Sequence, residues 1–267
     1  MTDPLSDRPA YRQVSDRLRQ HIDSGEWPAG YKLPSESQLM EQFSVSRVTV
    51  RLAVGALRAE GLILTRQGRG SFVRDREPTR RLTVGRYLQD ALYAAGRVAE
   101  PATVFGTGPD DDPGRYRLER QFHEERAGQH VADLLAIQVG DLVLQRRFTL
   151  YVEERPDQIT TSYLPMELVK DTIIADPDNE PWPGGTIAQL ARIGRPVTRV
   201  EESVRARMPT PEETGMLRIA AGVPVLVVTR RMFNGPLKDL PVELAHDIVL
   251  PSDRVILDYG IDLDVDS

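Results

Sequence analysis

The residues with the clearest chemical potential form a short pattern near the N-terminus, Ser46-Arg47-Val48-Thr49-Val50-Arg51. Arg47 and Arg51 are four positions apart, so on a helix their guanidinium groups share one face. An arginine can donate two parallel hydrogen bonds to guanine O6 and N7, and each such pair contributes about 1–3 kcal/mol of base discrimination. Ser46 and Thr49 add hydroxyl groups that suit phosphate oxygens near a helix N-terminus. The pattern therefore indicates contact with double-stranded DNA.

Three short helices are predicted to position this pattern. The first spans residues 11–24, and the second starts after Ser35, where Gln38 completes a capping box. The third spans residues 46–60, and its buried stripe is expected at Val48, Leu52, Ala53, Ala56, Leu57 and Ala59. Two short helices joined by a three- to four-residue turn form a helix-turn-helix.

A β-hairpin is predicted directly after the third helix. Residues 62–65 form a strand-like run, and residues 71–74 return after a glycine-rich basic turn. In that turn Gly68 and Gly70 allow close backbone approach, and Arg69 between them can enter a minor groove. The hairpin therefore has the form of a wing beside a helix-turn-helix.

The charge of the chain is divided unevenly. The 267 residues carry a net charge of −6, which taken as an average disfavours a nucleic-acid binder. Residues 1–81, however, hold 14 basic and 10 acidic residues, a net of +4, and the remainder carries a net of −10. Such an asymmetry suggests that only the first part meets a polyanion. The charge distribution agrees with a basic DNA-reading segment followed by an acidic body.

Composition excludes several other classes of protein. With 40% hydrophobic residues the chain can bury a core, and without cysteine it has no disulfide and no thiolate metal site. No apolar run approaches the ~20 residues of a membrane span, and the first residues lack the apolar core of a signal peptide. We therefore expect a cytoplasmic protein that makes no membrane contact.

The rest of the chain mixes helical and strand-like segments. Helices are predicted at residues 87–95, 131–137, 186–193 and 211–218, the last with Thr210 as its N-cap. Strands are predicted at residues 115–122, 142–152, 158–164, 197–207, 223–233 and 242–250. Strands joined by short turns indicate an antiparallel sheet, so the fold class is α+β. We expect a winged helix-turn-helix domain at 1–74, a linker at 75–81 and a second domain at 82–267.

The sequence holds no pattern typical of catalysis. Its four histidines are scattered, without the H-E-x-x-H spacing of a zinc site. It contains neither a G-x-S-x-G nucleophile elbow nor a G-x-x-x-x-G-K phosphate loop. We therefore predict no catalytic residue, no metal site and no cofactor.

Residues 33–73, LPSESQLMEQFSVSRVTVRLAVGALRAEGLILTRQGRGSFV, resemble the DNA-binding motif of the GntR family of bacterial transcription regulators. The resemblance implies that the third helix contacts bases or the DNA backbone. It also implies that the second helix positions the third, and that the wing contacts DNA. The implied DNA-binding residues are Ser35, Glu36, Ser46, Arg47, Thr49, Arg51, Gly68, Arg69 and Gly70.

Residues 82–257 resemble the UTRA domain of the HutC subfamily, which has a chorismate-lyase-like fold and binds small effectors. The stretches that carry the likeness are Leu82-Thr83, Arg146-Arg147, Thr161-Ser162-Tyr163-Leu164-Pro165, Gly184-Gly185-Thr186-Ile187, Glu201-Glu202 through Pro211-Glu212-Glu213, and Leu240-Pro241-Val242-Glu243. The implied effector-binding residues are Thr83, Arg147, Ser162, Tyr163, Thr186 and Glu243.

Two of these residues have a purely structural alternative. Thr186 either only caps its helix or also directs backbone N–H groups at an anionic effector. Glu243 either faces a ligand amine or hydroxyl or is a paired surface glutamate. Phosphosugar-binding members carry two arginines two positions apart, whereas Arg146 and Arg147 are adjacent and only one can face a pocket. Ala188 also replaces a tyrosine often found there, so both departures disfavour a phosphosugar.

The resemblance implies a homodimeric transcriptional repressor that binds a pseudo-palindromic operator and responds to a small-molecule effector. Two other functions stay open at this point. One is a chorismate-lyase-like enzyme with a DNA-binding head. The other is a constitutive DNA-binding protein with an inert dimerisation domain.

Overall fold

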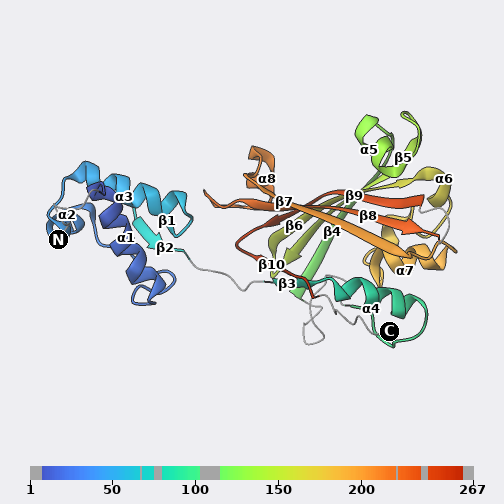
Figure 1. The fold of residues 1–267 in the computed structure, drawn as a ribbon, viewed down its shortest axis with the longest axis horizontal. Helices are drawn as coiled ribbons and strands as arrows, with labels where there is room; N and C mark the ends of the chain where they lie inside the picture. The colour runs from blue at the N-terminus through green and yellow to red at the C-terminus, as the bar shows by residue number, and fades with distance from the viewer. Residues whose placement is uncertain are drawn as a thin grey trace, which may run out of the picture. The chain divides into compact units, whose positions relative to one another are not determined.

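The structure is a computed structural model that describes residues 8–66, 68–74, 80–102, 115–220, 222–235 and 240–260. The chain divides into two compact units (Figure 1). The first holds residues up to 78 together with 208–214 and 218–224, and the second holds the rest. Residues 75–79 of the predicted linker lie outside the described residues. In the part that is described, no helix is both long and apolar enough to cross a membrane.

The N-terminal unit is a three-helix domain with a hairpin. Its elements are α1 (Ala10–Asp23), α2 (Glu36–Phe43), α3 (Arg47–Ala59), β1 (Ile63–Arg66) and β2 (Gly70–Val73). The two strands are antiparallel, with Ile63 opposite Val73. Apolar side chains from all three helices and both strands form one core, which includes Leu18, Leu39 and Leu57. The predicted winged helix-turn-helix is confirmed.

Side-chain caps fix the starts of the two helices of the helix-turn-helix. The Ser35 hydroxyl accepts a hydrogen bond from the Gln38 backbone N–H (3.3 Å), and Gln38 Oε1 accepts one from the Ser35 backbone N–H (2.8 Å). The Ser46 hydroxyl accepts a hydrogen bond from the Thr49 backbone N–H (3.2 Å). Because such caps satisfy N–H groups that a helix leaves unpaired, they set where α2 and α3 begin.

The buried stripe of α3 differs from the predicted one. Val50, Ala53 and Leu57 are buried, whereas the side chains of Val48 and Leu52 are 67% and 53% exposed. Ala59 is exposed as well. The stripe follows the i, i+3, i+7 spacing from position 50, so the prediction was wrong at positions 48, 52 and 59. The true stripe leaves two aliphatic side chains in solvent beside the arginine pair.

The second unit is built on a six-stranded antiparallel sheet in the order β4-β5-β6-β9-β8-β7. The strands are β4 (Tyr116–Arg126), β5 (Leu142–Val152), β6 (Arg155–Pro165), β7 (Arg199–Arg207), β8 (Val225–Asn234) and β9 (Leu240–Pro251). A separate parallel pair joins β3 (Arg80–Thr83) to β10 (Val255–Asp258). The sequence predicted the long strands but missed this pair, because four residues give too short a pattern.

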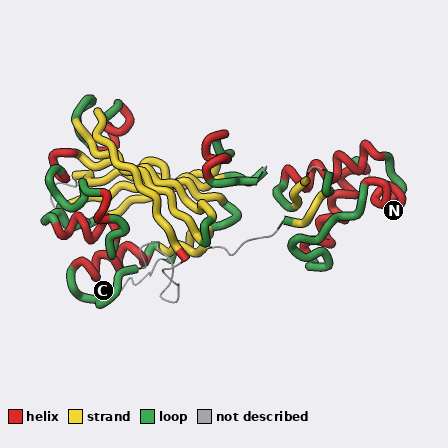
Figure 2. The backbone as a smooth tube through the Cα atoms, turned by 180° about the vertical axis from the view of Figure 1, so that it is seen from behind, coloured by secondary structure: helices red, strands yellow, loops and turns green. Residues whose placement is uncertain are grey.

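Helices cover both faces of the sheet. They are α4 (Gly85–Ala94), α5 (Gln129–Leu135), α6 (Met166–Val169) and α7 (Gly185–Arg192), with a 3₁₀ turn at Pro177–Asn179. Helix α8 (Pro211–Met216) instead begins in the segment 208–214 that belongs to the first unit. α4 and α7 pack together and share a core with Leu144 of β5, whereas α5 packs with Val143 of that strand. Since neighbouring strand residues point to opposite faces, α5 lies across the sheet from α4 and α7 (Figures 1 and 2). Thr210 caps α8 as predicted, accepting from the Glu213 N–H at 3.2 Å.

Two leucine substitutions in α3 test the observed stripe. We expect Leu57→Ala to lower the free energy of unfolding by about 2–5 kcal/mol, because a fully buried side chain leaves a cavity. Leu52→Ala in the same helix should change it by less than about 0.5 kcal/mol. Denaturation would be followed by the fluorescence of Trp27, which is buried in the same core, in a Trp182→Phe background. Equal losses for both variants would refute the assigned stripe.

Candidate nucleic-acid interface and ligand cavity

The exposed face of α3 presents the two arginines together. The side chains of Arg47 and Arg51 are 59% and 66% exposed, and both turn toward Glu36 at the start of α2. Glu36 Oε1 accepts a hydrogen bond from Arg51 Nε at 2.9 Å, and Glu36 Oε2 lies 3.7 Å from Arg47 Nε. One carboxylate thus holds two guanidinium groups side by side. The spacing in the sequence predicted the shared face, and the glutamate fixes the arrangement.

The predicted hydroxyl groups lie at the starts of α2 and α3. Ser46 and Thr49 hydrogen-bond to each other at 2.9 Å, and Ser35 belongs to the capping box. These side chains therefore order the two helix N-termini. The positive end of a helix dipole and its free N–H groups attract phosphate oxygens there.

The wing carries its basic residues around a tight turn. Gly68 and Gly70 have φ angles of +70° and +105°, which glycine adopts without strain. The backbone N–H of Arg69 closes the turn on the Arg66 carbonyl at 3.0 Å. A Cβ on Gly70 would lie 3.2 Å from Lys32 Cε, so the Lys32 side chain runs along the wing. No local pattern could have pointed to Lys32, because it lies far from the turn in the sequence.

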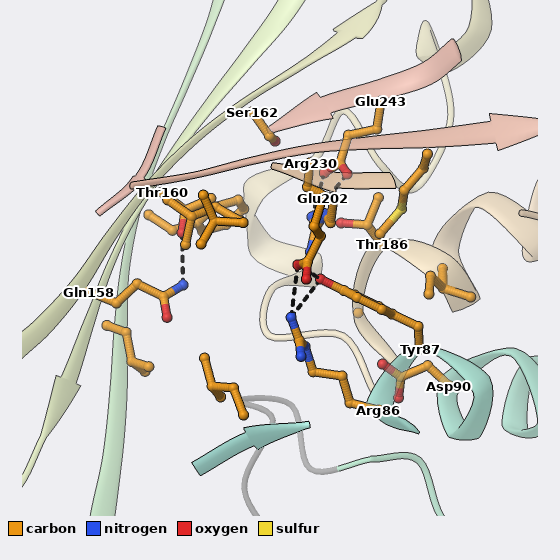
Figure 3. Close-up of a pocket in the computed structure, with 18 of the residues that line it drawn as sticks. Arg86, Tyr87, Asp90, Gln158, Thr160, Ser162, Thr186, Glu202, Arg230 and Glu243 are labelled. Carbon is orange, nitrogen blue, oxygen red and sulfur yellow. Dashed lines mark hydrogen bonds and ion pairs between the residues drawn. The ribbon is translucent and has the colours of Figure 1, made fainter. Parts of the chain in front are cut away.

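The second unit contains a cavity of about 200 Å³ between the sheet, α4 and the start of α7 (Figure 3). Strands β5 and β6 supply Phe148, Thr160 and Ser162, and β8 and β9 supply Arg230 and Glu243. The close-up shows Arg86, Tyr87 and Asp90 on the α4 side, across from these strands. A cavity with apolar walls and a few converging polar groups is the usual form of a small-molecule site.

Three of the six predicted effector residues lie in the cavity wall, namely Ser162, Thr186 and Glu243. Glu243 is buried and pairs with Arg230 at 2.9 Å, so it is not a surface glutamate. The other three predicted residues, Thr83, Arg147 and Tyr163, do not line the cavity. Thr83 is exposed. Tyr163 contacts Gln145 on the opposite face of the sheet.

Of the adjacent arginines Arg146 and Arg147 on β5, it is Arg146 that faces the cavity side of the sheet, and the predicted residue Arg147 does not. Even-numbered residues of β5 face the cavity side, so Arg147 points the other way and contacts Met216 Sδ at 3.2 Å. Arg146 is fully buried behind the cavity wall. Its Nη2 donates to Thr186 Oγ1 (2.9 Å), and its Nη1 donates to Gln189 Oε1 (3.1 Å).

Thr186 is not the N-cap that the sequence suggested. Gly184 occupies that position with a φ of +77°, and no side chain caps the helix. A Cβ on Gly184 would lie 2.8 Å from Ala188 Cβ and 2.9 Å from Tyr93 Cδ1, so the close approach of α4 and α7 requires glycine. Thr186, one residue into α7, instead accepts the hydrogen bond from Arg146.

Charged groups of the cavity wall are mostly paired with each other. Arg86 bonds to Glu202 at 2.9 Å, and the Tyr87 hydroxyl also donates to that carboxylate. Burial raises the pKa of Tyr87 to about 12. Burial also raises the pKa of Asp90 to about 7, although a backbone hydrogen bond from Ala102 and the charge of Arg86 oppose the shift. Among the described residues, no cluster of three or more His, Asp or Glu side chains could hold a metal ion.

The raised pKa of Asp90 predicts a pH-dependent gain from Asp90→Asn. Because the folded pKa exceeds the unfolded value of about 3.9, the folded state binds this proton more tightly. Wild-type stability therefore falls as pH rises from about 4 to about 7, where the buried carboxylate ionises. Asp90→Asn should raise the melting temperature at pH 8, and the gain should shrink at pH 5. Asp133→Asn, at an exposed carboxylate on α5, is the matched control. A gain from Asp90→Asn that is equal at both pH values would refute the assignment.

Comparison with known proteins supports both the N-terminal winged helix-turn-helix and the second domain. The sequence profile described as "Bacterial regulatory proteins, gntR family" matches residues 10–73, and that of the UTRA domain matches residues 120–254. A histidine utilization repressor of Pseudomonas putida is 28% identical over 238 residues, covering 89% of this chain and 88% of that protein. An HTH-type transcriptional regulator of Mycobacterium tuberculosis is 30% identical over 245 residues, covering 89% and 81%.

A solved crystal structure described as a GntR-family transcriptional regulator has a TM-score of 0.71 at 29% identity, covering 96% of this chain and 99% of that one. The chain is thus a DNA-binding transcriptional regulator with a winged helix-turn-helix and a UTRA domain. It belongs to the GntR family, and its UTRA domain and its likeness to histidine utilization repressors place it in the HutC subfamily.

Proposed function

We propose that this protein is a homodimeric repressor whose affinity for a pseudo-palindromic operator is changed by a small-molecule effector. The observation that carries the proposal is the combination of an exposed arginine pair on α3 with a polar-lined cavity in a separate unit. Relatives named as repressors support the sign of the regulation. We propose that the protein acts in the cytoplasm, where its DNA target lies.

On the DNA side, Arg47 and Arg51 would reach base edges in the major groove, with Glu36 setting their positions. The helix N-termini around Ser35, Ser46 and Thr49 would bind phosphates. The wing residues Gly68, Arg69 and Gly70 would follow the backbone into the adjacent minor groove. In a symmetric dimer the two half-sites would be centred about 34–36 Å apart, or a multiple of that.

On the effector side, Ser162, Thr186 and Glu243 remain the proposed contacts, because they lie in the cavity wall. Arg146 is fully engaged with protein groups, and Phe148 occupies the next inward position of β5. The cavity therefore lacks the second inward arginine of phosphosugar-binding members, and we propose a different effector class. Since the relatives are named as regulators, we infer that the cavity binds its ligand without converting it.

The effector link is tested by a reciprocal titration. The operator would first be selected from a random DNA pool, and a metabolite library would then be screened for release of that operator. If a compound binds in the second unit and weakens DNA binding, the DNA must weaken binding of that compound by the same factor. Isothermal titration calorimetry would measure binding of the compound with and without operator, and binding of the operator with and without the compound. An effector that tightens operator binding would refute repression relieved by effector.

Substitutions on α3 test the assigned base contacts. We expect Arg47→Ala and Arg51→Ala each to relax base preference at one position per half-site and to cost about 1–3 kcal/mol of specific affinity. Arg58→Ala, at an exposed arginine near the end of the same helix, is the matched control. Repeating the random-pool selection with each variant reads the preference directly. An unchanged preference in both test variants would mean that α3 does not read bases.

A further inference from the structure

Among the residues that line the cavity, Asp90 on α4 and Arg230 on β8 each have a buried polar atom without a hydrogen-bond partner in the described part of the chain. These atoms are Asp90 Oδ1 and Arg230 Nε. One is an acceptor and the other is a donor. Buried polar groups are nearly always paired, and an unpaired one costs about 1–3 kcal/mol. A pair of this kind inside a cavity points to groups that a ligand would satisfy.

Asp90 differs from the other three carboxylates of the wall. Glu180, Glu202 and Glu243 each form an ion pair with an arginine at 2.9–3.4 Å. Asp90 accepts a backbone hydrogen bond from Ala102. Its interactions with Arg86 and Arg230 act only through space, without a hydrogen bond among the described residues. The Asp90 carboxylate is therefore the acidic group of the wall whose charge is not matched by direct contact.

The chemistry of an ionised carboxylate limits what can bind it. A carboxylate only accepts hydrogen bonds, so its partner must be a donor. A donor that is itself positively charged forms a bond about twice as strong as a neutral one. Arg230 Nε, on the opposite side of the cavity wall, requires an acceptor in turn. The cavity volume of about 200 Å³ lies below the roughly 300–1,000 Å³ of sites for drug-sized ligands, which favours a small metabolite.

We propose that Asp90 selects the effector, and that the effector is a small metabolite that carries a protonated nitrogen for Asp90 and an oxygen acceptor for Arg230. The nitrogen is an ammonium or guanidinium group, which stays protonated at pH 8. This inference rests on the proposed function, since it names the ligand class of the same cavity. It assigns specificity to a helix residue that lies outside the stretches by which the sequence resembles its subfamily.

The titration of Asp90 agrees with this assignment. Burial raises its pKa to about 7, so near neutral pH the empty site is partly protonated, and a cationic ligand would displace that proton. Of the groups around it, Arg86 and Arg230 stay charged, Glu202 is held by Arg86, and Tyr87 titrates with a pKa of about 12. Affinity for a cationic ligand should therefore rise with pH up to about 7 and then level off.

The test uses the full-length wild type, Asp90→Asn and the control Asp133→Asn. Each is screened by thermal shift at pH 7.5 against a metabolite library that includes pairs differing in an ammonium or a hydroxyl group. Such pairs are L-histidine with imidazole-lactate, L-lysine with 6-hydroxynorleucine, and 4-aminobutyrate with 4-hydroxybutyrate. Dissociation constants of all stabilising compounds are then measured by calorimetry at pH 6 and pH 8. The Asp90→Asn substitution removes a buried charge and keeps the side-chain shape, so we expect this variant to fold.

We expect the stabilising compounds to carry a basic nitrogen, and we expect Asp90→Asn to weaken their binding at least about tenfold at pH 8. Asp133→Asn should bind as the wild type does. Stabilising compounds without a basic nitrogen, or equal binding by wild type and Asp90→Asn, would overturn this inference and leave the proposed function intact. If no compound stabilises the wild type while operator selection succeeds, the effector-responsive function itself fails, and the inference fails with it.

Discussion

The second unit depends on one buried charge. The Arg146 guanidinium has no exposed surface and donates hydrogen bonds to groups of β6, β9, α7 and the segment before α7. It lies beside the edge-to-face rings of Phe122 and Phe148. Burying an unpaired charge would cost several kcal/mol, so every one of these partners must be in place at once. The same network holds the start of α7 against the sheet. The floor of the cavity is therefore fixed by an electrostatic requirement as well as by apolar packing.

The two units differ in how much of them could be predicted from the sequence. The helix-turn-helix follows from local signals, because the Ser35 and Ser46 caps act over three residues and the exposed arginines of α3 are four apart. The cavity is assembled from residues far apart in the chain, and Arg146 meets Glu243 across 97 positions. Neither periodicity nor capping carries that information, so the sequence did not point to Asp90 and Arg230. Thr83, Arg147 and Tyr163, which it did point to, do not line the cavity.

The error on α3 has a related cause. Val48 and Leu52 fit a helical apolar spacing as well as Val50 and Leu57 do, and hydrophobicity alone cannot separate two overlapping stripes. The stripe that is buried is the one that packs against α1 and the wing. The other remains in solvent on the face that carries the arginines. An aliphatic residue at helical spacing is thus not by itself evidence of burial.

The glutamate between Arg47 and Arg51 has a further consequence. A free arginine side chain samples many rotamers, and fixing one costs about 2 kcal/mol. Because Glu36 holds Arg47 and Arg51 before any DNA arrives, part of that ordering is preorganised in the free protein. The carboxylate also leaves the trio with a net charge of only +1, which weakens its attraction to phosphates of any sequence. One acidic residue at the start of α2 thereby both orders the arginine pair and reduces its net charge.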